Sequence, residues 1–271
     1  MELVRGEAVT KYASEHRLDS RARLGLVMMV CNAIQHAHQK GIIHRDIKPS
    51  NIIVTQSDGQ LIPKVIDFGI AKATQGDLTP EATMTMQAQA VGTPAYMSPE
   101  QADPALGDID TRTDVYSLGV VLYELLTGTT PLSRDELTSK SYQELVQSIR
   151  DQDPPRPSAR LATKTREENH SVSTIEPGQL KGDLDWIVMK CLEKEPGRRY
   201  ETVSALGEDI SRFLRNEPVL ARPASRAYVM RKFIRRNRGG VIAASLILGT
   251  MLIGIAGTTV GLLWALDEQE R

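Results

Sequence analysis

A run of 26 residues without a charged side chain, VIAASLILGTMLIGIAGTTVGLLWAL, occupies positions 241–266. As an α-helix this run would be about 39 Å long, enough to cross the roughly 30 Å hydrocarbon core of a bilayer with some tilt. The alternative is a buried helix of a soluble protein, but a soluble helix rarely runs this far without a polar face. The run therefore predicts a single transmembrane helix over residues 240–266, followed by an extracytoplasmic stub, residues 267–271.

The charged residues on either side of the run predict its orientation. Between Arg222 and Arg238 the chain has seven Lys or Arg and no acidic residue, whereas DEQER follows the run. The positive-inside rule then places residues 1–238 in the cytoplasm. A basic segment of this kind could bind nucleic acid, but beside an apolar run it favours anionic lipid headgroups. We therefore expect residues 218–239 to be a basic juxtamembrane segment with lipid, and not nucleic acid, as its partner.

Small residues within the run give a signal for helix pairing. Gly257 and Gly261 form a GxxxG pattern, and Ser245 and Gly249 have the same spacing. Such pairs let two helix backbones approach closely, but glycine is common in transmembrane helices in any case. A homodimer and a single helix both remain open.

The residues before the run have the composition of an ordinary packed protein, since the whole chain is 41% hydrophobic and 25% charged. Cys31 and Cys191 both lie in apolar helical patterns, so we expect core thiols and no disulfide or zinc site. Residues 150–182 are polar and Pro-rich and are expected to be a surface insertion or linker. Hydrophobic periodicity predicts helices over residues 21–39, 114–127, 183–194 and 202–215, and a β-hairpin from residues 52–54 and 65–66.

Five short motifs follow one another in the first 200 residues. HRDIKPSN, His44 to Asn51, has the form H-R-D-x-x-x-x-N, and DFG, VGTPAYMSPE, DVYSLG and RRY come after it in that order. This set resembles the eukaryotic-like Ser/Thr protein kinase family, and its layout is similar to that of membrane-anchored bacterial members. The resemblance covers residues 1–217. It implies a mainly α (α+β) fold, the C-terminal lobe of a kinase with short β-hairpins, followed by the transmembrane helix.

The resemblance implies transfer of the ATP γ-phosphate to Ser or Thr of protein substrates in signalling, with ATP and Mg²⁺ as cofactors. Asp46 would be the catalytic aspartate that orients or accepts the proton of the attacking hydroxyl. Lys48 would neutralise charge on the γ-phosphate and mark Ser/Thr specificity. Asn51 and Asp67 would bind the metal that bridges the ATP phosphates.

Four further residues take their expected roles from the same resemblance. Thr93 would bond the catalytic aspartate and lysine. Glu100 and Arg199 would form a buried ion pair. Asp114 would hold the backbone of the catalytic loop.

Regulation by phosphorylation is implied by Arg45, since an arginine before the catalytic aspartate can pair with a phosphate. Among the threonines of the following loop, Thr83 and Thr85 are the favoured phosphosites. Three histidines near the loop are expected to pack or to form hydrogen bonds, not to act as bases: His36, His38 and His44.

Protein kinases carry a Gly-rich loop and a β3 lysine before the catalytic loop, and neither precedes His44 in this sequence. The opening MELVRGEAVTKYASEH resembles the segment that links the two kinase lobes. Glu2 and Val4 would then be hinge residues whose backbone meets adenine, and Met1 would lie at the back of that pocket. Three interpretations remain open: a fragment of a longer kinase, a catalytically silent membrane-tethered scaffold or decoy, and a chain whose N-lobe comes from another protein.

With MgATP and a generic basic protein, we expect the 271-residue chain alone to transfer no more phosphate than its Asp46→Ala variant. The reason is that positioning and electrostatic terms of the ATP cradle supply several kcal/mol of transition-state stabilisation. Incorporation of radiolabelled phosphate measures the difference, and transfer above that of the variant would contradict the expectation.

Overall fold

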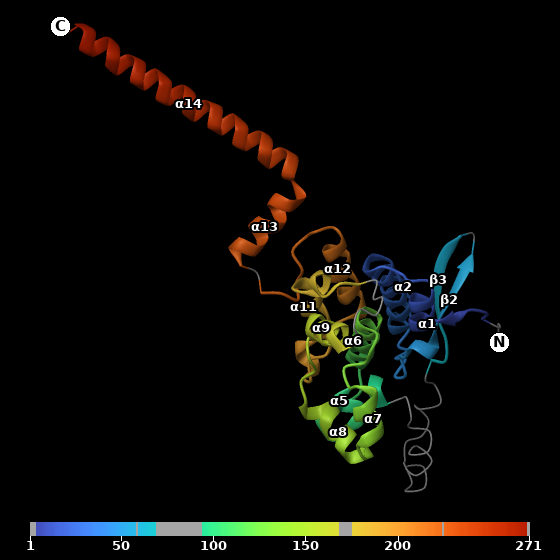
Figure 1. Cartoon of the computed structure of the whole chain (residues 1–271). Coiled ribbons are helices and arrows are strands. Elements are labelled where there is room, and N and C mark those ends of the chain that lie inside the picture. Colours follow the sequence, from blue (N-terminus) through green and yellow to red (C-terminus); the bar gives the residue numbers. More distant parts are fainter. Residues whose placement is uncertain (1–3, 58, 69–93, 168–174, 224, 270–271) are drawn as a thin grey trace, which may run out of the picture. The chain divides into compact units, whose positions relative to one another are not determined.

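The computed structural model describes residues 4–57, 59–68, 94–167, 175–223 and 225–269 (Figure 1). The chain divides into two compact units. We call the first the globular unit, which comprises Met1–Arg215 with Val219–Arg222, and the second the C-terminal unit, which comprises Asn216–Pro218 with Pro223–Arg271.

A small antiparallel sheet lies beside helix α2 in the globular unit (Figure 1). The hairpin predicted from residues 52–54 and 65–66 is confirmed, with strands that extend further toward the turn. Gly6 lets the first strand approach, because a Cβ at this position would lie 2.3 Å from the Val54 carbonyl oxygen. The strands, in the order β1-β2-β3, are Glu7–Ala8, Ile52–Ser57 and Gln60–Val65.

The centre of the globular unit is helix α6, Thr111–Thr127, most of whose residues are buried all round. It packs against α2, α9, α11 and α12. Gly119 on α6 allows a close approach to α11, because a Cβ there would lie 2.4 Å from the Cβ of Cys191. Gly128 ends the helix with a left-handed φ of 75° and donates its N–H to the Glu124 carbonyl. The predicted helix over residues 114–127 is therefore confirmed, and it begins three residues earlier, at Thr111.

Of the other helices of the globular unit, some pack directly on α6, and others, such as α8, pack on a neighbouring helix (Figure 1). The predicted helices over residues 21–39, 183–194 and 202–215 are confirmed as α2, α11 and α12, with ends that differ by at most three residues. The bounds are α1 Val9–Glu15, α2 Ser20–Gln39, α5 Pro99–Ala102, α7 Arg134–Ser139, α8 Tyr142–Asp151, α9 Pro157–Glu167, α10 Pro177–Leu180, α11 Asp183–Cys191 and α12 Val203–Leu214. Single 3₁₀ turns cover Pro49–Asn51, Pro94–Tyr96, Pro104–Leu106 and Pro196–Arg198.

The segment expected to be a polar insertion or linker, residues 150–182, takes part in the core instead. It contains α9 and α10, and Leu161 and Leu180 are buried in the hydrophobic cluster. The buried Asp185 of α11 accepts hydrogen bonds from the Ser158 backbone N–H (2.9 Å) and hydroxyl (2.7 Å), which fixes the first turn of α9. The sequence pattern did not reveal this because polar residues on the outer face of α9 outnumber the few apolar residues that face inward.

The C-terminal unit is almost wholly helical. Helix α13 covers Arg226–Arg236, and helix α14 covers Arg238–Gln269. Among the described residues, one helical stretch, Arg238–Thr259, is long and apolar enough to cross a membrane by length and composition. Side chains along this stretch are exposed, for example Leu252 at 59% and Ile253 at 74%.

Candidate active site

The loop His44–Asn51 brings three of the predicted site residues into direct contact. The Lys48 ammonium lies 2.9 Å from Oδ2 of Asp46. The Asn51 amide nitrogen donates to the Asp46 carbonyl at 2.8 Å and lies 3.3 Å from its carboxylate. The side chains of Asp46 and Lys48 are partly exposed, whereas Asn51 is buried. The partly exposed Asp46 carboxylate therefore contacts both the Lys48 ammonium and the Asn51 amide.

The buried carboxylate of Asp114 holds the backbone of this loop from below. Its Oδ1 accepts from the backbone N–H of Arg45 at 2.9 Å, and its Oδ2 accepts from that of His44 at 2.9 Å. Oδ2 also lies 2.7 Å from Nε2 of His38. The side chain of Asp114 is fully buried in the first turn of α6, where the partial positive charge of the helix N-terminus favours a carboxylate.

The backbone of the site is strained at two residues, one in the loop and one after β3. Arg45 has a φ of 64° and Asp67 a φ of 55°, in the left-handed region that costs an ordinary residue roughly 1–2 kcal/mol. The Arg45 peptide is fixed on both sides, since its N–H donates to Asp114 and its carbonyl accepts from the Gln101 side chain at 2.7 Å. These contacts stabilise a conformation that the isolated segment would leave.

His44 supports the loop and has both ring nitrogens engaged. The Asp46 backbone N–H donates to its Nδ1 at 3.3 Å, so Nε2 carries the proton and donates to the Ile66 carbonyl at 3.1 Å. The ring is buried, with its centroid 4.7 Å from that of Phe68. A histidine with both nitrogens occupied cannot serve as a proton acceptor for a substrate, so its role is to pack.

The hairpin brings the two expected metal ligands to the same end of the sheet. The Ile66 N–H donates to the Asn51 carbonyl at 2.9 Å, which extends the pairing of β2 and β3 to the residue before Asp67. Because the Asn51 amide nitrogen points at Asp46, its Oδ1 lies on the other side. There it accepts a long hydrogen bond from the Ser50 hydroxyl at 3.5 Å and keeps a second lone pair that could bind a cation.

These two residues fit a magnesium–nucleotide complex, although they make no complete metal cage. In the part of the chain that the structure describes, no group of three or more His, Cys, Asp or Glu could hold a metal ion. Mg²⁺ commonly takes one or two protein oxygens and completes its shell with phosphate oxygens and water. An amide oxygen from Asn51 and a carboxylate from the exposed Asp67 are donors of that kind.

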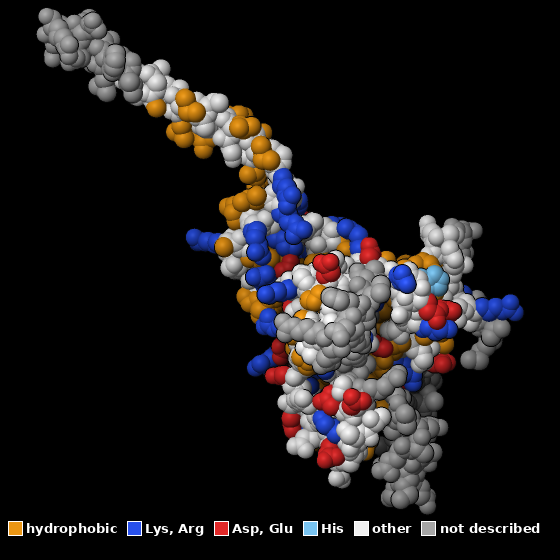
Figure 2. Space-filling view, viewed as in Figure 1, with side chains coloured by type: hydrophobic (Ala, Val, Ile, Leu, Met, Phe, Trp, Pro, Cys, Tyr) orange, Lys and Arg blue, Asp and Glu red, His pale blue; other side chains and the backbone are white. Residues whose placement is uncertain are grey.

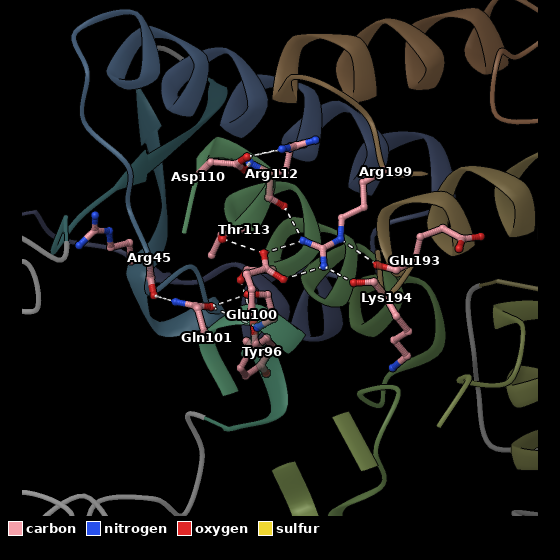
Figure 3. A network of polar contacts seen from close by, with 12 residues as sticks. Arg45, Tyr96, Glu100, Gln101, Asp110, Arg112, Thr113, Glu193, Lys194 and Arg199 are labelled. Carbon is pink, nitrogen blue, oxygen red and sulfur yellow. Dashed lines mark hydrogen bonds and ion pairs between the residues drawn. The ribbon is translucent and has the colours of Figure 1, made fainter. Parts of the chain in front are cut away.

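Glu100 and Arg199 form a buried bidentate ion pair (Figure 3), with distances of 2.7 and 2.8 Å. Both side chains are nearly inaccessible to solvent. Burial alone would raise the pKa of Glu100, but the hydrogen bonds and positive charge of Arg199 outweigh it, and the pKa is lowered. The remaining Arg199 donors are satisfied by backbone carbonyls of Arg112, Glu193 and Lys194.

This ion pair connects to the loop His44–Asn51 through α5 (Figure 3). Glu100 and Gln101 are neighbours on that helix, and Gln101 donates to the Arg45 carbonyl. Thr113, the residue before Asp114, donates its hydroxyl to the Glu100 carboxylate at 2.8 Å. The loop, α5 and the start of α6 are therefore linked by a continuous set of hydrogen bonds.

Several predicted site residues lie outside the described residues: Glu2, Thr83, Thr85 and Thr93. Val4 is described and lies half-buried just before β1. The roles expected for these five residues stay predictions, as do the catalytic and metal-binding roles of Asp46, Lys48, Asn51 and Asp67.

The sequence did not predict the contacts that two polar residues make at the site. His38, expected only to pack or hydrogen-bond, contacts Asp114, whereas His36 is exposed. Gln101 had no expected role. The only local signal was that His38 lies in the last turn of α2, close to the loop in sequence.

Comparison with solved structures shows a protein kinase fold. The chain is similar to the kinase domain of Mycobacterium tuberculosis PknI, with a TM-score of 0.50 and 23% sequence identity over 78% of this chain and 63% of that chain. Comparison with protein families matches residues 1–209 to the family described as "Protein kinase domain". The chain therefore belongs to the protein kinase family.

Curated relatives agree with this assignment. The chain is 37% identical over 206 residues to "Serine/threonine-protein kinase PknB" of Mycobacterium tuberculosis (strain ATCC 25618 / H37Rv), an alignment that covers 76% of this chain and 28% of the relative. It is 36% identical over 225 residues to "Probable serine/threonine-protein kinase SCO3848" of Streptomyces coelicolor, covering 83% of this chain and 29% of the relative. The chain thus spans less than a third of the length of these relatives.

Replacing Arg199 by Met should lower the free energy of unfolding by about 3–5 kcal/mol, because the Glu100 carboxylate would remain buried without its partner. The double variant Glu100→Met/Arg199→Met should lose clearly less than the sum of the two single variants. Urea unfolding of the full chain in detergent, followed by tryptophan fluorescence, measures all three.

Arg198 provides the matched control for this cycle, because it is the next residue and its ion pair with Glu195 is exposed, at 71% and 67%. Arg198→Met should change the free energy of unfolding by less than about 1 kcal/mol. Strictly additive losses at Glu100 and Arg199 would show that the two side chains do not act as a pair.

Proposed function

We propose that this chain works in a membrane-anchored serine/threonine protein kinase, which transfers the γ-phosphate of ATP to Ser or Thr of protein substrates. The observation that carries the proposal is the contact of Lys48 and Asn51 with Asp46, on a loop fixed by Asp114. The printed names of the relatives, serine/threonine-protein kinases, support the residue specificity.

The arrangement suits phosphoryl transfer, a reaction in which the protein contributes mainly positioning and charge. Asp46 would accept a hydrogen bond from the substrate hydroxyl and orient its oxygen. Lys48, 2.9 Å from that carboxylate, puts a positive charge where the phosphoryl group would pass. Asn51 and Asp67 would hold Mg²⁺, which when bound neutralises charge on the ATP phosphates. Glu2 and Val4 would meet the adenine, and Thr93 would bond Asp46.

Phosphorylation of the chain itself is the regulation that this proposal includes. Arg45 lies beside Asp46 on the strained loop, and its guanidinium would pair with a phosphate on Thr83 or Thr85.

The test compares the wild-type protein with an Asp46→Asn variant, each expressed together with any coding sequence that is found in frame before Met1. Asp46→Asn should lower kcat for phosphorylation of a basic protein by roughly 10²–10⁴-fold, because an amide cannot accept the hydroxyl proton. Asp108→Asn, an exposed acidic residue before α6, should leave kcat unchanged. Equal activity of wild type and Asp46→Asn would contradict the proposal, and inactivity of both would favour the scaffold or decoy.

We also propose that α14 spans the membrane, with residues 1–238 in the cytoplasm. Its length and apolar composition support this, and so do its threonines. The hydroxyls of Thr250, Thr258 and Thr259 donate to carbonyls of the same helix at 2.8–3.0 Å, so they need no water. Anionic lipids at the basic flank, and a homodimer through Gly257 and Gly261, are the partners this placement would allow.

A spanning α14 should keep the chain in the membrane pellet after alkaline carbonate extraction. The variant Leu248→Asp/Leu252→Asp should be released, because each carboxylate at the centre of a span costs about 2.5–3.5 kcal/mol. Immunoblotting of pellet and supernatant measures the partition. Release of the wild-type chain would refute the span.

A further inference from the structure

Helix α13 is a defined element between the globular unit and the apolar helix. Its first turn is capped by Ser225, whose hydroxyl accepts from the Tyr228 N–H at 3.2 Å. Its end is closed by the Asn237 N–H, which donates to the Phe233 carbonyl at 2.9 Å. Asn237 alone separates α13 from α14, which begins at Arg238. The end of α13 therefore lies within a few ångströms of the first turn of α14.

One face of α13 presents large apolar side chains to solvent. At 100° per residue, Val229, Met230, Phe233 and Ile234 fall within one arc about 140° wide. They are 42%, 58%, 50% and 43% exposed, respectively. The exposed apolar side chains of comparable size in the globular unit are spread along the chain, at Met29, Ile42, Ile62, Leu106, Ile109 and Leu220. On α13 four such side chains lie within six residues, and such a cluster needs a physical explanation.

Basic residues border the apolar face on both sides. Arg231 and Arg236 lie about 60° and 20° beyond its two edges, Arg235 lies opposite, and all three are exposed. Arg236 is 3.3 Å from Glu217, and between residues 218 and 238 the sequence has no acidic residue. Figure 2 shows these orange and blue side chains side by side along the α13 segment.

We propose that α13 lies in the plane of the bilayer surface, with Val229, Met230, Phe233 and Ile234 inserted at the boundary between headgroups and acyl chains and its arginines on anionic lipid phosphates. The proposal rests on the membrane span proposed for α14. An amphipathic helix with an apolar stripe and a basic border has the composition of an interfacial helix. The connection to α14 at Asn237 keeps it at that depth.

An inserted α13 differs physically from a basic segment that is only attracted to a charged membrane. An electrostatic tether would leave all side chains in water above the headgroups. An inserted helix of 11 residues, about 16 Å long, would bury four particular side chains and leave Arg235 outside. The two arrangements differ in the depth of individual positions, which can be measured.

The experiment uses the full chain with an environment-sensitive fluorophore on one introduced cysteine, in the variants Phe233→Cys, Arg235→Cys and Leu252→Cys. The native Cys31 and Cys191 are fully buried, and burial raises the pKa of the Cys31 thiol to about 12, so they should not react in the folded protein. The chain is reconstituted in vesicles of phosphatidylcholine and phosphatidylglycerol. Quenching is compared for lipids with a spin label at a shallow or a deep acyl carbon.

The shallow quencher should quench the label at position 233 at least about threefold more than the label at 235, and the deep quencher should act best on the label at 252. Replacing phosphatidylglycerol by phosphatidylcholine should reduce quenching at 233 and leave quenching at 252 unchanged, because only α13 depends on anionic headgroups.

The label at 252 separates the failure of this proposal from the failure of the span. If 252 is quenched while 233 and 235 are equally unquenched, α13 stays in water and the proposal is overturned, with the span intact. If 252 is not quenched, the span fails and α13 has no membrane to lie on. If 233 is shielded from lipid and its emission changes with the protein-to-lipid ratio, a second copy covers the face and the proposal is overturned.

Discussion

The buried carboxylate of Asp114 holds the loop His44–Asn51 to the core of the globular unit. It accepts hydrogen bonds from two successive backbone N–H groups, those of His44 and Arg45, and contacts His38. Because Asp114 sits in the first turn of the deeply buried α6, the loop takes its position from a helix at the centre of the core. The left-handed φ of Arg45 persists only because these bonds offset its strain.

The Glu100–Arg199 pair supports the same loop from the other side. A fully satisfied guanidinium and carboxylate fix α5 in place, and α5 in turn presents Gln101 to the Arg45 carbonyl. Buried ion pairs give little net stability over apolar residues, but they strongly disfavour arrangements in which one partner is left alone. The pair therefore selects one position for α5, and with it one position for the loop. The side chain of Asp46 is presented on a backbone restrained at both ends.

The two units differ in where their apolar side chains go. The globular unit buries its apolar residues between α2, α6, α11 and α12, whereas α14 and one face of α13 expose theirs. In water the exposed arrangement would be unfavourable at about 25 cal/mol per Å² of apolar surface. A bilayer would remove that cost for α14, and its headgroup boundary would do so for α13. The proposed membrane attachment would therefore involve two kinds of helix, one crossing the bilayer and one lying on it.

The sequence by itself determined the family, the main helices and the long apolar helix, because motif order, helical periodicity and stop signals such as Gly128 are local properties of the chain. It could not assign the contact of His38 with Asp114 or of Gln101 with Arg45. Those partners are 76 and 56 positions apart, and no local pattern relates them. The prediction of a surface insertion or linker over residues 150–182 was wrong, since Leu161 and Leu180 become core residues only when α9 and α10 pack against their neighbours. Only the tertiary structure decided which side chains fix the loop, because the folded core brings distant segments together.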